Sequence, residues 1–241
     1  VQAAEHLLQR CFRFTAFRHG QLRLLTHTLQ QHHWLASMPP GAGKSLMYQF
    51  AGLMQPALSF VLEPLAALAI DQQDSLNDRF IDSVGCLHES LGRDTRESVR
   101  KRIVSGEVLF CITTAELFRN DETVDALNGV QHASLYFAQC VVDEAHSLSE
   151  WSHDHRLTMQ GALGYAVNRL RAGKKRQLPL RLLTASTSYD VLHDLQRQFT
   201  SIGKGYVLRS DQLVAIPSAL NDSLRYYVLP SKTENDDQDT V

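Results

Sequence analysis

The amino-acid sequence predicts an α/β fold in which helices flank a parallel β-sheet. Short apolar runs alternate with stretches of helical pattern along most of the chain. Some runs are almost entirely apolar, as at 57–62, which is typical of strands buried on both faces of a parallel sheet. Two motifs of small and polar residues directly follow such runs. Because ligands of parallel sheets bind beyond the carboxyl ends of the strands, these motifs mark the expected functional edge.

The expected elements follow one another in a regular order. Two amphipathic helices joined by an aromatic, basic loop come first, at 5–12 and 20–33. Strands are predicted at 34–38, 57–62, 107–113, 136–142 and 178–184, with a weaker one at 82–87. Helices are predicted at 44–54, 65–79, 93–105, 156–171 and 188–199.

The end of the chain differs in character. Residues 203–217 are loop-rich, 224–229 could form a further strand, and 231–241 are acidic and polar. We therefore divide the chain into N-terminal helices with their loop, a sheet domain and a connection, at 1–33, 34–203 and 204–241.

Bulk properties exclude some classes of protein. The net charge of −2 gives no basic footprint, so contact with nucleic acid is expected to be local or shared with regions outside this chain. No apolar run approaches the roughly 20 residues that cross a bilayer, so we expect no membrane partner. An intracellular location is expected, in the cytoplasm if the protein is bacterial and in the nucleus if it is eukaryotic. The chain begins with Val1 and is expected to be a piece of a longer protein.

Cysteine and histidine do not suggest a metal site. The four cysteines are far apart, form no Cys-x-x-Cys pair and are predicted to be buried, reduced thiols: Cys11, Cys86, Cys111 and Cys140. Most of the 11 histidines are expected on the surface or in loops.

The first motif is a Gly-rich turn between an apolar run and a helical pattern, at 38–45 (MPPGAGKS). This context suits backbone N–H groups that cradle phosphates, with Lys44 on the β- and γ-phosphates and the Ser45 hydroxyl on Mg²⁺. The strict pattern has Gly where this chain has Met38, and a turn that merely caps a helix is the alternative. The candidate nucleotide-binding residues are Pro40, Gly41, Ala42, Gly43, Lys44, Ser45 and Leu46.

The second motif places two carboxylates at the end of the apolar run 136–142. Asp143 can hold Mg²⁺, partly through water, and Glu144 can deprotonate a water in line with the γ-phosphate. A helix cap followed by a first-turn acid is the structural alternative. Together and in this order the two motifs predict NTP hydrolysis, with Lys44, Asp143 and Glu144 as the catalytic residues.

Five blocks resemble, in their order, those of the first motor domain of RecQ-type DNA helicases, which are DEAH-box members of helicase superfamily 2. They are 14–21 (FTAFRHGQ), 38–45, 64–72 (PLAALAIDQ), 143–156 (DEAHSLSEWSHDHR) and 183–187 (LTAST). In that family the P-loop usually begins with Met, so Met38 fits. The resemblance implies a RecA-like P-loop NTPase domain that uses ATP and Mg²⁺.

The resemblance assigns the first block to adenine. Gln21 carries a donor and an acceptor and can pair with adenine N6 and N7. Phe14 could stack on the base, and Arg18 could contact the base or a phosphate. Phe17 is better explained as a core anchor.

The residues after the carboxylates could sense single-stranded DNA. Rings and a guanidinium on a loop suit base stacking, at Trp151, His153, His155 and Arg156. A loop packed on its own domain is the alternative for Trp151. His146 is interpreted as a hydrogen-bonding relay to Thr184 or Ser186, although those two residues could instead only cap the next helix.

Several departures from the family fall in the DNA-associated blocks. Ser152, His155 and Leu157 replace residues that are usually Gly, Phe and Pro. Glu63 replaces a small hydroxyl residue and is expected to place a negative charge where a phosphate approaches. The segment 113–116 lacks the usual Pro-Glu-Arg. The ATP machinery is therefore expected to be intact and the DNA-contacting surface altered.

The resemblance implies a 3′–5′ DNA helicase motor whose partners are single-stranded DNA, duplex DNA and a second RecA-like domain. That second domain supplies an arginine finger, so the chain alone is expected to hydrolyse ATP poorly and not to unwind DNA. One alternative is a nucleotide-dependent binding or scaffolding module with impaired DNA coupling. Another is an unrelated P-loop ATPase, which the Gln21 block and the Trp151 loop disfavour.

Overall fold

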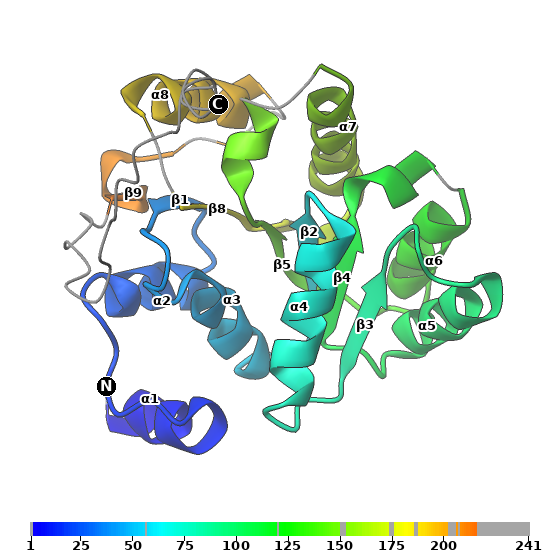
Figure 1. Ribbon diagram of the computed structural model, residues 1–241, viewed down its shortest axis with the longest axis horizontal. Coiled ribbons are helices and arrows are strands. Elements are labelled where there is room, and N and C mark those ends of the chain that lie inside the picture. Colours follow the sequence, from blue (N-terminus) through cyan, green and yellow to red (C-terminus); the bar gives the residue numbers. More distant parts are fainter. Residues whose placement is uncertain are drawn as a thin grey trace, which may run out of the picture.

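A computed structural model describes residues 2–55, 57–119, 121–149, 153–173, 176–185, 188–201, 206 and 208–215. Its centre is a seven-stranded sheet in the order β3-β4-β2-β5-β8-β1-β9, with every neighbouring pair parallel (Figure 1). The strands are β1 (Trp34–Ser37), β2 (Leu58–Glu63), β3 (Val84–Leu87), β4 (Phe110–Thr114), β5 (Phe137–Val142), β8 (Leu180–Thr184) and β9 (Leu213–Ala215). The predicted parallel sheet is confirmed. A small antiparallel pair, β6 (Arg171–Gly173) and β7 (Arg176–Gln177), lies outside it.

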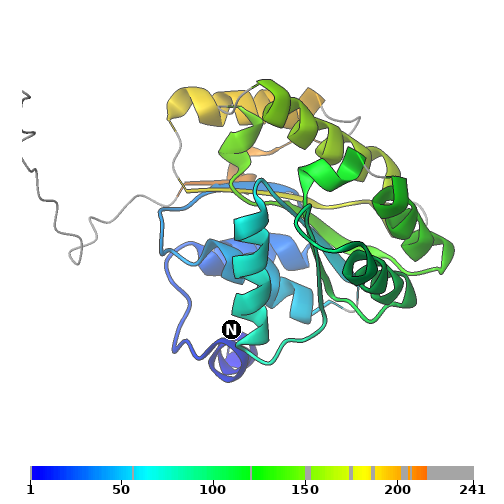
Figure 2. The same cartoon turned by 45° about the vertical axis from the view of Figure 1, so that its right-hand side comes forward.

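The helices form a layer on each face of this sheet (Figure 2). One layer, drawn in blue and cyan, contains α1 (Gln2–Leu7), the π-helical turn η1 (Leu8–Phe12), α2 (Gln21–Leu29), α3 (Lys44–Leu53) and α4 (Ala66–Asn77). The other, in green to yellow, contains α5 (Arg93–Ser105), α6 (Asp121–His132), α7 (His153–Arg169) and α8 (Tyr189–Ser201). Three short 3₁₀ turns complete the described elements: η2 (Ala115–Arg119), η3 (Ala145–Leu148) and η4 (Ser210–Gln212).

Side chains of the central strands alternate between two apolar cores. Phe60 and Leu62 of β2 belong to the core under α6, α7 and α8, whereas Val61 belongs to the core under α2, α3 and α4. Val141 and Val142 of β5 divide in the same way. Burial on both faces explains why these strands are nearly continuous apolar runs.

Helix α3 lies very close to the sheet. A Cβ added at Gly52 would stand 2.4 Å from the ring of Phe110 and 2.9 Å from Ser59 Oγ. The side chain of Gln139 on β5 donates to the Tyr48 carbonyl at 3.0 Å. These contacts fix the position of α3, and its first residues carry the Gly-rich motif.

One helix occurs where the sequence predicted no element. The dipeptide Asn128-Gly129 is typical of a turn, but in the structure it lies inside α6. A Cβ at Gly129 would come within 3.1 Å of Val104 on α5, so the missing side chain lets the two helices approach each other.

Segments near both ends of the described residues join the same core as the sheet. Leu8, Phe12, Leu24 and Leu25 pack in one apolar cluster with β1 and α3. Strand β9, from the segment predicted as a connection, pairs with β1 at the sheet edge. The division at 33/34 and 203/204 therefore does not separate independent cores in the described residues. The predicted elements at 224–229 and 231–241 lie outside the described residues.

The structure bears on the expectations for the cysteines and for membrane-spanning helices. All four cysteines lie in described residues and are free thiols; Cys86, Cys111 and Cys140 are buried and Cys11 is partly buried. Within the described residues, none of the helices is both long and apolar enough to cross a membrane.

Candidate nucleotide-binding site

The two motifs predicted from the sequence meet at the carboxyl edge of the sheet. The Gly-rich turn leaves β1, and Asp143 and Glu144 leave β5, with β8 between these two strands. The Met38 N–H donates to the carbonyl of Thr184 at the end of β8 at 2.9 Å, and the Asp143 N–H donates to the Leu62 carbonyl of β2 at 3.1 Å. Four neighbouring strands therefore build one site.

The Gly-rich turn has a backbone that requires glycine. Gly41 and Gly43 have φ angles of +76° and +80°, in the left-handed region that residues with a Cβ rarely adopt. The Ala42 N–H closes a turn on the Pro39 carbonyl at 3.1 Å, and α3 begins directly afterwards at Lys44. The first N–H groups of a helix have no partner within the helix, so this turn and helix start form a cradle for an anion.

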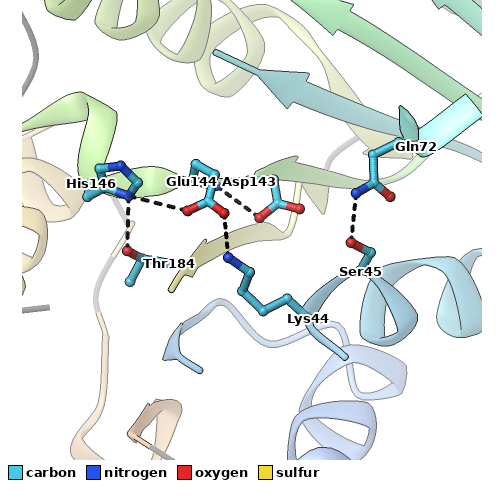
Figure 3. A network of polar contacts seen from close by, with 7 residues as sticks. All are labelled: Lys44, Ser45, Gln72, Asp143, Glu144, His146 and Thr184. Atoms are coloured by element: carbon cyan, nitrogen blue, oxygen red, sulfur yellow. Dashed lines mark hydrogen bonds and ion pairs between the residues drawn. The ribbon is translucent and has the colours of Figure 1, made fainter. Parts of the chain in front are cut away.

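Lys44 and the DEAH motif form one polar network (Figure 3). Lys44 Nζ lies 2.5 Å from Glu144 Oε1. His146 Nδ1 lies 3.4 Å from Glu144 Oε2 and 3.3 Å from Thr184 Oγ1. The relay predicted between His146 and Thr184 thus has the geometry it needs. Glu144 itself adopts a left-handed conformation with φ of +46°, and its N–H donates to Asp143 Oδ1 at 2.9 Å.

Asp143 is 3% exposed. Burial raises the pKa of Asp143 to about 6, against the opposing effects of the Lys44 charge and the Glu144 N–H. In the part of the chain that the structure describes, no three His, Cys, Asp or Glu side chains are arranged to hold a metal ion. Mg²⁺ commonly uses only one or two protein carboxylates and fills its other positions with water and phosphate oxygens. The pair Asp143 and Ser45 fits that kind of site.

Glu63 has a different environment from the one expected. It ends β2, is 1% exposed, and its Oε1 atom has no hydrogen-bond partner among the described residues. Strand alternation turns its side chain, like that of Asp143, toward α3. Burial, and then the charges of Asp143 and Glu144, raise the pKa of Glu63 well above its ordinary value. The expectation of a negative charge open to an approaching phosphate is therefore wrong, because Glu63 is a buried carboxyl whose burial disfavours the charged form.

The block assigned to adenine packs on the Gly-rich turn. Gln21 Oε1 accepts the Arg18 N–H at 2.8 Å, and Gln21 Nε2 donates to the Ala42 carbonyl at 2.8 Å. The Arg18 guanidinium donates to the Gly41 carbonyl. A carboxamide has two N–H groups and two acceptor positions, so Gln21, although only 2% exposed, has one of each beyond these contacts. A Cβ at Gly43 would stand 2.7 Å from Gln21 Nε2, which shows how tightly the two segments fit.

The two aromatic residues of that block differ in exposure. Phe14 is 42% exposed and leaves a ring face accessible. Phe17 packs edge-on against Phe50, with ring centroids 5.3 Å apart, as expected of a core anchor.

The residues predicted to sense DNA are only partly described. Arg156 lies in the first turns of α7 and is half-buried, while for His153 and His155 the structure describes only the α7 backbone. Trp151 and Ser186 lie outside the described residues. Their roles stay predictions.

Sequence reasoning missed one residue of the site. Gln72, on α4, donates from Nε2 to Ser45 Oγ at 2.9 Å (Figure 3). It stands in the block 64–72, which resembles a DNA-associated motif of the family and gave no indication of a contact with the Gly-rich motif. An amide side chain about two turns into a helix gives no sequence signal that points to a hydroxyl on another helix.

The fold and the site together define a nucleoside-triphosphate-binding domain of the RecA-like class. A sequence profile described as DEAD/DEAH box helicase matches residues 18–195. The chain belongs to the DEAD/DEAH box helicase family, whose members use ATP.

Curated relatives narrow the resemblance. The probable ATP-dependent DNA helicase RecS of Bacillus subtilis is 30% identical over 191 residues, which are 79% of this chain and 36% of the relative. The RecQ-like DNA helicase blm-1 of Caenorhabditis elegans is 27% identical over 91% of this chain and 21% of the relative. The similarity to RecQ-family helicases predicted from the sequence is confirmed. The chain spans between about a fifth and two fifths of the length of these two relatives.

Solved structures support the fold. A DUF1998 helicase, MrfA, bound to DNA has a TM-score of 0.63 at 17% identity, covering 90% of this chain and 29% of that one. A hypothetical ATP-dependent RNA helicase from Sulfolobus tokodaii has the same TM-score at 14% identity, covering 90% of this chain and 57% of that one.

Proposed function

We propose that this chain is the ATP-binding motor domain of an ATP-dependent 3′–5′ DNA helicase, in which ATP hydrolysis drives movement on single-stranded DNA and duplex unwinding. The observation that carries the proposal is the contact between Lys44 of the Gly-rich turn and Glu144 of the DEAH motif. It brings a phosphate-binding cation and a candidate base to one point. The relatives named as DNA helicases support the choice of substrate.

The roles of the residues follow from their positions. Backbone N–H groups from Gly41 to Leu46 hold the phosphates, and Lys44 neutralises their charge. Mg²⁺ would be held by Ser45 and Asp143, partly through water, and would neutralise charge on the β- and γ-phosphate oxygens.

Glu144 is the candidate general base. It orients the attacking water and accepts its proton, after Lys44 has moved from Glu144 to the phosphates. His146 Nδ1 lies 3.4 Å from the other carboxylate oxygen and contacts Thr184 Oγ1 on its other side.

A second RecA-like domain completes the active form in this proposal. In such motors an arginine from a second element stabilises the transferring phosphoryl group, and its contribution is about 10³–10⁵ in rate. We expect this chain alone to bind ATP·Mg²⁺ and to hydrolyse it slowly. The protein that carries both domains should hydrolyse ATP rapidly when single-stranded DNA is present.

The test is DNA-stimulated ATP hydrolysis by the full-length protein. We expect single-stranded DNA to raise the rate at least 10-fold, and Trp151→Ala to remove most of that stimulation. Tyr189→Ala, at an exposed ring on α8, is the matched aromatic control. Stimulation that survives Trp151→Ala would contradict the role given to that loop. A rate that DNA does not change would favour the nucleotide-dependent scaffolding module, to which the departure at 113–116 also points.

A further inference from the structure

Helix α4 contributes a side chain that reaches the proposed metal ligand on α3. Gln72 Nε2 donates to Ser45 Oγ at 2.9 Å (Figure 3). The oxygen of the same amide, Gln72 Oε1, accepts from Tyr48 Oη at 2.9 Å and from Gln49 Nε2 at 3.0 Å. One amide from α4 therefore contacts three side chains in the first two turns of α3.

These contacts determine which way the amide faces. Turned over, its N–H groups would face the Gln49 N–H donor, so in the arrangement observed the oxygen faces Gln49 and Tyr48. Tyr48 is fully buried, and burial raises the pKa of its hydroxyl well above the ordinary value, which keeps it a donor. The nitrogen of Gln72 is thereby directed at Ser45.

The Ser45 hydroxyl is left with one free position. A hydroxyl has one proton and two lone pairs. Gln72 occupies one lone pair, and Ser45 lies close enough to Asp143 for its hydroxyl to lower the pKa of that carboxyl. Asp143 and Tyr48 are both acceptors within reach of its proton, and with the proton on either of them a single lone pair remains.

We propose that Gln72 is a positioning residue that presents this lone pair of Ser45 to Mg²⁺. The inference rests on the proposed function, because it assigns Mg²⁺ to Ser45 and Asp143. Without Gln72 the hydroxyl can rotate, and part of the energy of Mg²⁺ binding is then used to orient it. Gln72 belongs to α4, so the same contact ties the metal ligand to a helix outside the two nucleotide motifs.

The test separates metal positioning from general packing. We would measure binding of a fluorescent ADP to this chain, first against Mg²⁺ concentration at fixed ADP and then in EDTA. Gln72→Met keeps the length of the side chain and removes its polar atoms. We expect the Mg²⁺ concentration at half-saturation to rise about 2- to 10-fold, as for loss of one hydrogen bond, with unchanged affinity for ADP in EDTA.

Two further variants act as controls. Gln131→Met removes a comparable hydrogen bond, which the Gln131 amide donates to the Arg169 carbonyl away from the site. This variant should shift neither curve. Tyr48→Phe removes one of the two donors to Gln72 Oε1 and should shift the Mg²⁺ curve in the same direction by less. If Gln72→Met fails to fold, Tyr48→Phe still tests the proposal.

The outcomes are distinct. If a folded variant at Gln72 loses affinity for ADP equally with and without Mg²⁺, or shows no shift, the positioning role is wrong. If the unmodified chain binds ADP with no Mg²⁺ dependence, the metal assignment of the proposed function fails, and this inference fails with it.

Discussion

Lys44 Nζ and Glu144 Oε1 lie 2.5 Å apart, although 100 positions separate the two residues in the sequence. Their side chains are largely buried, at 13% and 24% exposed. Each has another partner in the proposed reaction: phosphate oxygens for Lys44 and a water for Glu144. In the proposed reaction, nucleotide binding would therefore have to separate this ion pair before Glu144 could act as a base.

Replacing Glu144 with Gln should separate binding from turnover. Glu144→Gln keeps the shape of the side chain, so the full-length protein should bind ADP·Mg²⁺ at least as tightly, since Lys44 has lost a competing carboxylate. Without a base, ATP hydrolysis should fall about 10²- to 10⁴-fold. Steady-state hydrolysis and calorimetry measure the two effects, with the surface variant Glu97→Gln as control. Hydrolysis near the unmodified rate would show that Glu144 is not the base.

Gln21→Ala should lower the preference for adenine. Gln21 holds the Gly-rich turn through Ala42, and it is also the residue predicted to pair with adenine. If it reads adenine, affinity for ADP falls about 10-fold while affinity for GDP changes less. Parallel titrations with ADP and GDP give this ratio, and Gln9→Ala, at an exposed amide, is the control. Equal losses for both nucleotides would mean that Gln21 only supports the turn.

The raised pKa of Asp143 predicts two opposite pH effects. The folded protein holds this proton up to a pKa of about 6, whereas the unfolded chain releases it near the ordinary aspartate pKa of 3.8. The stabilising contribution of protonated Asp143 to the free energy of unfolding is thus fully present below about pH 4 and is lost as pH rises to about 6. Affinity for ADP·Mg²⁺ should rise over the upper part of this range, because Mg²⁺ needs the carboxylate.

Asp143→Asn removes this titration and serves as the comparison. Without ligand it should be more stable than the unmodified chain at pH 7, by about 2–3 kcal/mol, with the difference shrinking toward pH 4. Chemical denaturation at several pH values measures it. A difference independent of pH would contradict the assignment of the titration to Asp143.

Glu63→Gln should stabilise the ligand-free protein. Burial and the neighbouring acids raise the pKa of Glu63. At pH 8 the unfolded chain has released this proton, so folding must either take up a proton or bury an ionised carboxylate. Each unit of such a shift costs about 1.4 kcal/mol. The variant should therefore melt at a higher temperature at pH 8, with little difference near pH 4. A lower melting temperature at pH 8 would mean that the carboxylate has a stabilising partner.

The site was largely predictable where backbone and chemistry coincide in short motifs. The Gly-rich turn and the carboxylates at 143–144 each follow a strand, so parallel-sheet geometry brings them together. The environment of Glu63 was predicted wrongly and the contact of Gln72 was not predicted. Both arise from packing between β2, α3 and α4. A motif shows which residue type stands at a position but not whether it faces solvent or another helix.

Most strands were also predictable, because a strand buried on both faces of the sheet has a nearly continuous run of apolar residues. Helix α6 was not, since Gly129 indicates a turn by itself and its contact with Val104 on α5 exists only in the folded chain. Strand β9 has three residues and pairs with β1 from far along the chain, which no local pattern reveals.

The most direct measurement of the central claim is calorimetric titration of this chain with ADP·Mg²⁺, beside Lys44→Ala and a GDP control. The account predicts binding that favours ADP over GDP and weakens at least 10-fold in Lys44→Ala, which loses a charge-assisted contact to phosphate. Binding that is equally tight in a folded Lys44→Ala variant, or absent from the unmodified chain, would contradict it.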